Sequence, residues 1–211
     1  MKIIALAAAK GGVGKSTLAA TLSTAAIIDR PGIRVGLVDL DPQGSLTLWW
    51  NARALPYPLM FSMAPGALAH AQDILRDERL DLLVLDCPPG FTSIQERAIA
   101  AADLVLVPTG PSKLDLDAVA ATAAMAERAG VPSSFVLNGA LFRSRLAGQA
   151  VMALRERGDL LYPPMHRRVA IAAAMADGRT ALETAPTGAA AREAQALWAA
   201  VQWELETGEG Q

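Results

Sequence analysis

The chain has 211 residues, of which 52% are hydrophobic, and a formal net charge of −2 at pH 7. This length suits one α/β domain with a sizeable core, and the acidic balance excludes a global positive field that would draw the protein to nucleic acid or anionic membranes. The single cysteine, Cys87, excludes an internal disulfide and suits a reducing compartment such as the cytoplasm.

The N-terminal segment predicts a buried strand followed by a phosphate-binding loop. The apolar run at residues 3–8 is too short to span a bilayer, and we interpret it as the first strand rather than a signal peptide. It leads into "AAAKGGVGKST", residues 7–17, which nearly fits G-x-x-x-x-G-K-[ST], with Ala9 in place of the first glycine. A glycine-rich turn between a strand and a helix presents backbone N–H groups and a positive helix end to phosphates.

This loop carries the groups that nucleotide chemistry needs. We expect Lys15 to bridge the β- and γ-phosphates, the Ser16 hydroxyl to ligate Mg²⁺ and Thr17 to donate to the α-phosphate. Lys10 is a second lysine in a chain that has only four, which indicates a specific use, although a plain solvated charge is the alternative. The predicted ATP-binding residues of the loop are Lys10, Gly11, Gly12, Val13, Gly14, Lys15, Ser16 and Thr17.

Two later strands end in acids. Asp39 lies near the end of the apolar run at 34–40, and Asp41 lies in the turn that follows it. Asp86 ends the apolar run at 82–86. The carboxyl ends of parallel strands lie along one edge of a sheet, so these acids should lie beside the loop. We expect Asp39 and Asp86 to hold Mg²⁺ through water and Asp41 to orient the attacking water, and the predicted catalytic residues are Lys10, Lys15 and Asp41. A strand-end cap for Asp86 and an Asp-Pro turn for Asp41 are the alternatives.

The rest of the chain alternates short apolar runs with helical stretches. Near-continuous apolar strands separated by helices predict an α/β fold, a mostly parallel twisted sheet with helices on both faces. We expect one domain over residues 1–207 and a fraying tail at 208–211. Further strands are expected at 58–64, 104–108 and 134–138, and helices at 16–29, 44–54, 92–101, 115–129, 146–157 and 188–206.

Four blocks in this order resemble the deviant Walker A ATPases of the ParA/MinD superfamily: "KGGVGKST", "VDLDPQGS", "LLVLDCPPG" and "ADLVLVPTGPSKLDLDAV". The chain is most similar to the small, ParF-like ParA partition ATPases, over nearly its whole length. The resemblance implies the P-loop fold of this superfamily, with ATP and Mg²⁺ as cofactors. It also implies weak ATP hydrolysis within a homodimer that sandwiches two nucleotides.

The resemblance assigns further residues to the nucleotide and the dimer. Lys10 would cross the dimer interface to the partner's nucleotide, where its charge offsets repulsion between two triphosphates. Pro108, Pro111 and Asp115 would lie at the dimer face, unless that segment is a plain strand-to-helix turn. Asn138 would read the adenine edge, which suits an amide that both donates and accepts, or it is a turn-forming Asn-Gly.

A basic window lies in the C-terminal half. Residues 143–168 hold six arginines and two acids, so this window has a local charge of about +4 in an acidic protein. ParA-like dimers bind DNA without sequence preference through basic residues in this half of the fold, and phosphate contacts add across a dimer. An ordinary solvated arginine face is the alternative. The candidate DNA contacts are Arg143, Arg145, Arg167 and Arg168.

These observations predict an ATP-driven switch for plasmid or chromosome partition. A centromere-binding adaptor of the ParB/ParG kind would stimulate hydrolysis, and the protein would be cytoplasmic and nucleoid-associated with ATP. The acidic end of the chain, with Glu204, Glu206 and Glu209, argues against membrane attachment. The alternatives are the same switch acting on a chemoreceptor cluster, a protein microcompartment or transfer DNA, and a P-loop metabolic ligase.

Overall fold

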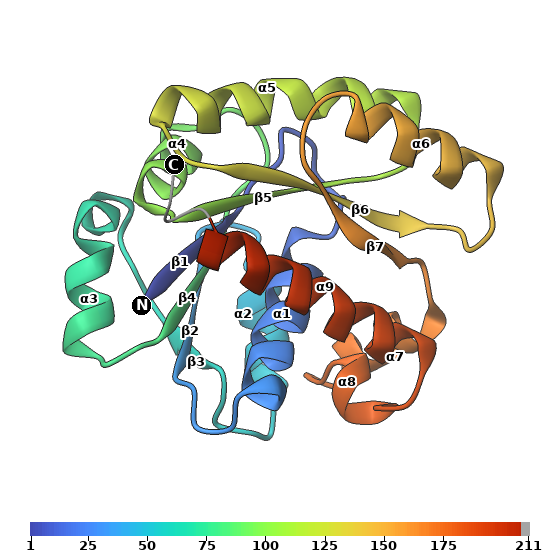
Figure 1. Cartoon of the computed structure of the whole chain (residues 1–211). Helices are drawn as coiled ribbons and strands as arrows, with labels where there is room; N and C mark the ends of the chain where they lie inside the picture. The colour runs from blue at the N-terminus through green and yellow to red at the C-terminus, as the bar shows by residue number, and fades with distance from the viewer. Residues whose placement is uncertain (208–211) are drawn as a thin grey trace.

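The computed structural model describes residues 1–207, and within them a seven-stranded sheet forms the centre of the molecule (Figure 1). All neighbouring strands in it pair in parallel, which confirms the predicted α/β class. The predicted fraying of 208–211 lies outside the described residues. Across the sheet the strands are β3 (Leu59–Phe61), β2 (Val35–Asp39), β4 (Leu82–Asp86), β1 (Lys2–Leu6), β5 (Leu104–Thr109), β6 (Ser133–Ala140) and β7 (Leu160–His166).

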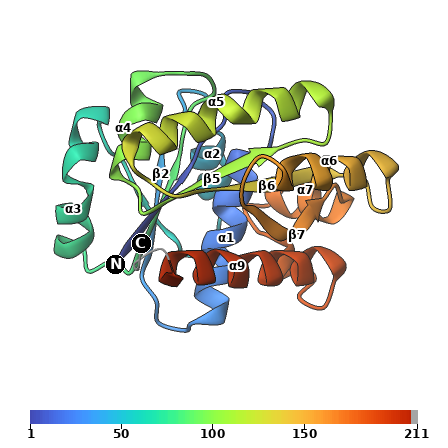
Figure 2. The ribbon, with the colours of Figure 1, turned by 45° about the horizontal axis from the view of Figure 1, so that its top comes forward.

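Helices cover both faces of the sheet. One face packs against α3 (Ala71–Asp77), α4 (Ser93–Ala101), α5 (Lys113–Ala129), α6 (Arg145–Arg155) and the short 3₁₀ helix η1 (Pro65–His70). The other packs against α1 (Lys15–Asp29), α2 (Ser45–Asn51), α8 (Ala181–Thr184) and α9 (Ala189–Thr207). Figure 2 shows α5 and α9 on opposite sides of the strands, and α7 (Val169–Ala176) precedes α8.

The strands supply both cores by simple alternation. Ile3 and Ala5 of β1 join the core under α4 and α5, whereas Ile4 and Leu6 join the core under α1 and α9. Successive side chains of a strand point to opposite faces, so a strand buried on both faces must be apolar at every position. This is why the inner strands are continuous apolar runs, and why their positions could be predicted.

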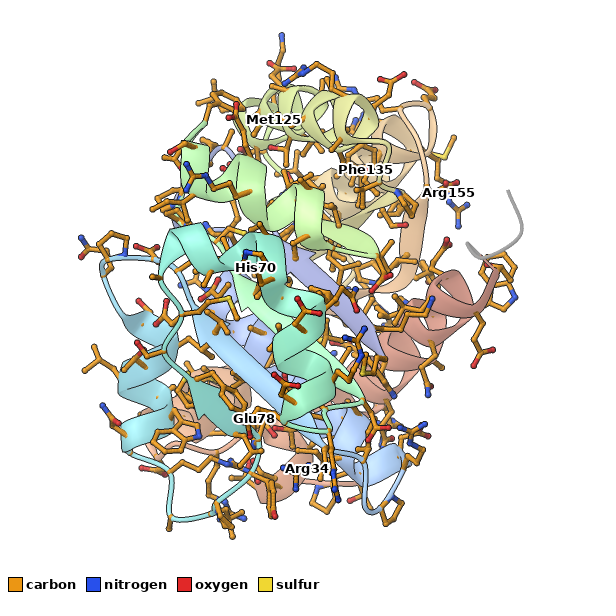
Figure 3. The ribbon with its side chains drawn as sticks, turned by 90° about the vertical axis from the view of Figure 1, so that its left-hand side faces the viewer. Arg34, His70, Glu78, Met125, Phe135 and Arg155 are labelled. Atoms are coloured by element: carbon orange, nitrogen blue, oxygen red, sulfur yellow. The ribbon has the colours of Figure 1, made fainter. Side chains whose placement is uncertain are left out.

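The register of the inner strands aligns their carboxyl ends. Leu6 of β1 pairs with Asp86 of β4, and Asp39 of β2 pairs with Asp86 from the other side. The opposite ends of these strands are also fixed. The Arg34 guanidinium donates to the Glu78 carbonyl oxygen at 3.1 and 3.3 Å, and the Arg34 backbone N–H donates to the Asp81 carboxylate at 2.9 Å (Figure 3).

The seventh strand was missed by sequence reasoning. β7 contains Pro163 and Pro164, which lack the backbone N–H that a central strand requires. Among the described strands β7 lies at the sheet edge and pairs with β6 alone, and at an edge proline is tolerated and also discourages pairing with another chain. Within residues 1–207, none of the helices has both the length and the apolar character needed to cross a membrane.

A buried ion pair joins α2 to the C-terminal third of the chain. Arg53, just after α2, binds Glu183 of α8 with both terminal nitrogens, at 2.6 and 3.1 Å, and donates to the Gly178 carbonyl oxygen. Burial raises the pKa of Glu183, but the hydrogen bonds from Arg53 and Thr180 outweigh it and the net pKa is lowered. Trp49 of α2 donates its indole N–H to the Arg179 carbonyl oxygen at 3.0 Å.

We predict that Arg53→Ala lowers the free energy of unfolding by about 3–5 kcal/mol, because it leaves Glu183 buried without its partner. Chemical denaturation measures this loss. Arg76→Ala is the matched control: Arg76 pairs with Asp73 at 3.0 Å on an exposed helix face, so its loss should cost less than about 1 kcal/mol. Equal effects of the two changes would contradict the prediction.

Candidate functional site

The glycine-rich loop joins β1 to α1 and leaves the helix end open. Gly12 and Gly14 have φ of 76° and 88°, a left-handed conformation that side chains rarely adopt. Gly14 occupies the N-cap of α1, and no side chain caps that end. The first N–H groups of α1 and its positive dipole end are therefore free to receive an anion, which the sequence pattern predicts to be phosphate.

Asn138 of β6 contacts this loop directly. Its amide nitrogen donates to the Val13 carbonyl oxygen at 2.8 Å, across 125 residues of sequence. A Cβ atom at Gly14 would collide with the same amide nitrogen. Asn138 thus holds the loop, a role that the sequence did not reveal, and its contact adds to the left-handed φ of Gly14 in disfavouring a side chain at this position. Its predicted contact with adenine stays a prediction.

A cavity of about 420 Å³ lies over the loop and the start of α1. Lys15, which lines it, is only 6% exposed, so its charge is directed into the site rather than into bulk water. The other predicted loop residues that line the cavity are Gly11, Gly12, Gly14, Ser16 and Thr17, and they are joined by Asp41, Gln43, Ser45 and Pro89. Asp41 therefore lines the same cavity as the loop, and its predicted position facing the γ-phosphate stays a prediction.

Asp86 is a fully buried carboxylate at the end of β4, near Ser16 and Lys15 of the loop. Neither of its oxygens has a partner within hydrogen-bond geometry among the described residues, although the Ser16 hydroxyl is close enough to favour the charged form. Burial, reinforced by the negative charge of Asp39, raises the pKa of Asp86 to about 7, against the opposing effects of Ser16 and Lys15. A buried carboxylate without a partner suits an Mg²⁺ ion or its bound water.

Asp39 and Asp41 have local structural partners as well. Asp39 accepts the Asp41 backbone N–H at 3.1 Å through one oxygen, and the Thr47 backbone N–H and hydroxyl at 2.8 and 3.0 Å through the other. Asp39 therefore anchors the first turn of α2. Asp41 accepts the Gln43 backbone N–H at 2.9 Å, so the turn-opening interpretation holds for one of its oxygens. Their metal and catalytic roles stay predictions.

Lys10 is not among the residues that line this cavity. Its ammonium nitrogen lies 2.7 Å from Asp115 Oδ1, while Asp115 Oδ2 accepts the Ser112 hydroxyl. Burial raises the pKa of Asp115, but the hydrogen bonds from Lys10 and Ser112 outweigh it and the net pKa is lowered. Gly110 permits this approach, since a Cβ there would lie 2.5 Å from Asp115 Oδ2. The turn between Pro108 and Asp115 thus holds Lys10 in its own subunit.

Of the four candidate DNA contacts, three are exposed. Arg143, Arg145 and Arg167 face solvent near the carboxyl ends of β6 and β7. Arg168 instead pairs with Glu193 of α9, which also accepts from His166 at 2.9 Å and from the His166 backbone N–H at 3.1 Å. The hydrogen bond to Glu193 raises the pKa of Arg168. Arg168 is thus held against α9 by an ion pair. The sequence analysis did not predict that Glu193, 25 residues away, would be its partner.

The fold and the loop together define a phosphate-loop nucleotide-binding protein. Its residues fit Mg²⁺ and a nucleotide: loop N–H groups, Lys15 and Thr17 for phosphates, and Ser16 with Asp86 for the cation. Mg²⁺ would supply charge neutralisation of the phosphate oxygens. Residues 4–181 match the family model described as the CobQ/CobB/MinD/ParA nucleotide binding domain. The chain belongs to this family and is a nucleotide-binding ATPase of the ParA/MinD type.

Comparisons with individual proteins agree with this assignment. The chain is 36% identical over 241 residues to the chromosome-partitioning ATPase Soj of Thermus thermophilus, covering 94% of this chain and 96% of that protein. It is also 36% identical over 218 residues to the maintenance of carboxysome distribution protein A of Gloeobacter kilaueensis, covering 97% and 94%. The septum site-determining protein MinD of Pyrococcus horikoshii, solved with Mg-ADP, has the same fold, with a TM-score of 0.79, 19% identity and coverage of 100% and 99%.

We predict that Asp86→Asn stabilises the metal-free protein at pH 8. The raised pKa means that the folded state holds this proton more tightly than the unfolded chain, whose value is near 3.8. The stability contributed by this group therefore falls as pH rises from about 4 to about 7. Asparagine does not ionise, so it removes this loss of stability. With a chelator present, the variant should have a higher melting temperature than the parent at pH 8, and the difference between the two melting temperatures should narrow toward pH 4.

Calorimetry at pH 4, 6 and 8 measures this dependence. With Mg²⁺ and nucleotide added, the order should reverse, because only the parent carboxylate is stabilised by the cation. A melting-temperature gap that does not change with pH would contradict the assigned cause.

Proposed function

We propose that this chain is a ParA-type ATPase switch for plasmid or chromosome partition. ATP and Mg²⁺ bind in the cavity over the glycine loop, and two subunits close face to face around two nucleotides. The dimer binds DNA without sequence preference at the nucleoid. A centromere-binding adaptor of the ParB/ParG kind then stimulates hydrolysis, and the subunits separate.

The observation that carries this proposal is the position of Lys10. It belongs to the phosphate loop, but it does not line the cavity formed by the rest of that loop, and its side chain is 40% exposed. A loop lysine that a monomer does not use for its own phosphates is suited to a nucleotide in a second subunit. A monomeric P-loop ligase has no such use for Lys10, which makes that alternative weaker.

A second candidate keeps the switch and changes the cargo. The relatives named above for chromosome partition and for carboxysome distribution are equally similar, each at 36% identity. The nucleotide site and the dimer are the same in both proposals, and only the adaptor and its cargo differ. Identification of the adaptor that stimulates hydrolysis separates them: a centromere-binding protein supports partition, and a protein bound to a microcompartment shell supports the alternative.

We predict that Lys10→Ala weakens ATP-dependent dimerisation strongly while monomer ATP affinity changes less than about three-fold. A lost charge contact to a triphosphate should weaken the dimer by more than about ten-fold, which corresponds to 1.4 kcal/mol or more. Light scattering with ATP, ADP or no nucleotide measures the dimer, and titration calorimetry measures binding. Arg76→Ala, which removes an exposed cation of α3 outside both the loop and the 108–115 segment, is the control. Full ATP-dependent dimerisation of the Lys10→Ala variant would contradict the proposal.

We also predict that DNA binding requires ATP and weakens steeply with salt. Each neutralised phosphate contributes about −0.9 to the slope of log K against log salt. Removal of Arg143 and Arg145 in both subunits should therefore flatten the slope by about 2 to 4. Arg192→Ala, a change to an arginine of α9 whose side chain donates to the Thr187 carbonyl oxygen, is the control. DNA binding that is indifferent to nucleotide would overturn the switch.

A further inference from the structure

The turn after β6 presents two large apolar side chains to solvent. Leu141 and Phe142 are 61% and 60% exposed, and they lie between the end of β6 and the start of α6. The Ser144 backbone N–H donates to the Leu141 carbonyl oxygen at 3.1 Å and closes the turn, and the Ser144 hydroxyl caps α6. Arg143 has φ of 57°, a left-handed conformation that is uncommon for a long side chain. Such backbone strain tends to persist at functional sites.

The Phe142 ring is held in place from several sides. The Arg143 and Arg168 guanidiniums lie 5.2 and 5.8 Å from the ring centroid. The His166 ring meets it edge to face, with centroids 5.3 Å apart and an interplanar angle of 77°. Arg168 and His166 are both anchored by Glu193. The exposed ring is therefore supported by groups that are themselves tied to α9, which makes it a preorganised feature of the surface.

Cations surround this apolar tip. Arg145 follows it at the start of α6, and the Arg167 backbone N–H binds the Ala140 carbonyl oxygen at 2.9 Å, which brings Arg167 alongside the tip. Glu193, which contacts both Arg168 and His166 beside the ring, is already matched by these two groups. The tip thus combines a small apolar surface with surrounding positive charge. Phosphate binding by the arginines alone does not explain why two large apolar side chains are exposed beside them.

We propose that Leu141 and Phe142 form an apolar wedge that enters the minor groove of duplex DNA and partly unstacks one base step. This proposal rests on the proposed DNA-binding function and adds a contact to the bases. Apolar wedges of Phe or Leu beside arginines are the chemistry by which proteins open and kink the minor groove. Arg143, Arg145 and Arg167 bind the flanking phosphates, and movement of Arg143 to a phosphate uncovers one face of the ring for stacking.

The charge pattern favours DNA over an anionic lipid surface. The Arg168 guanidinium lies 5.8 Å from the ring centroid and is tied to Glu193, so it would have to follow the ring toward the hydrocarbon of a bilayer, where charge is costly. In a DNA groove the same guanidinium remains among phosphates and water. A wedge of two residues also fits a single base step, and pyrimidine–purine steps such as TA open at the lowest energetic cost.

The test uses the full chain with Mg²⁺ and a non-hydrolysed ATP analogue. The probe is a duplex of about 30 base pairs with 2-aminopurine at a central TA step and a fluorophore pair at its ends. We expect binding to raise the 2-aminopurine fluorescence and to bring the ends closer. The double change Leu141→Ser and Phe142→Ser should remove both signals and weaken binding about ten-fold, with the salt slope unchanged. Met152→Ser, at a 63% exposed residue of α6 away from the tip, is the matched control and should change none of them.

The outcomes separate the wedge from the function on which it rests. If the parent binds DNA with ATP but gives no unstacking, or if the double variant binds and unstacks as the parent does, the wedge is wrong and the switch stands. If the parent binds no DNA in any nucleotide state, both fail. If the double variant instead loses binding to phosphatidylserine vesicles and keeps DNA unstacking, the tip is a lipid contact and the proposal is overturned.

Discussion

The in-register parallel pairing of β4 between β1 and β2 is the constraint on which the site depends. It places the end of β1 on one side of Asp86 and Asp39 on the other. The sheet thereby brings one carboxylate into an apolar interior where protein groups give it little compensation, and its pKa rises to about 7. The hydrophobic cores on the two faces of the sheet offset the free-energy cost of burying this carboxylate. The same carboxylate is prepared for a divalent cation, because it is buried and neither of its oxygens has a geometric hydrogen-bond partner among the described residues.

Helix α2 connects this edge of the sheet to the C-terminal part of the molecule, because side-chain contacts fix both of its ends. Asp39 anchors its first turn through Thr47, and Trp49 and Arg53 fix its other end to the segment between α7 and α8. A Cβ at Gly178 would lie 2.7 Å from the Ala52 carbonyl oxygen, so the two segments touch backbone to backbone. The turn that carries Asp41 and Gln43 therefore cannot shift without moving α2 or straining a buried ion pair.

Local pattern was enough for most of the fold and for the loop. The apolar runs from β1 to β6 and the glycines at 12 and 14 are determined by burial on both faces and by backbone conformation, which short stretches of sequence encode. β7 was missed because Pro163 and Pro164 contradict a strand until its edge position is known. The bonds from Asn138 to Val13 and from Lys10 to Asp115 span 125 and 105 residues. Glu193, which holds Arg168, lies in a helix predicted only as packing. Such pairings arise from the topology of the sheet, and no local spacing signals them.

The pairing of Lys10 with Asp115 also bears on how a dimer would form. One ammonium group cannot bind Asp115 and reach a second subunit at once, so the contact within the subunit competes with the proposed contact between subunits. Both side chains are partly exposed, and ion pairs of this kind contribute about 1 kcal/mol or less. A triphosphate carries more charge and accepts more hydrogen bonds than one carboxylate, and it lies in a site from which dimer closure would exclude water. In the proposed dimer, the contact with Asp115 would therefore be weak enough to yield when a second, ATP-loaded subunit approaches.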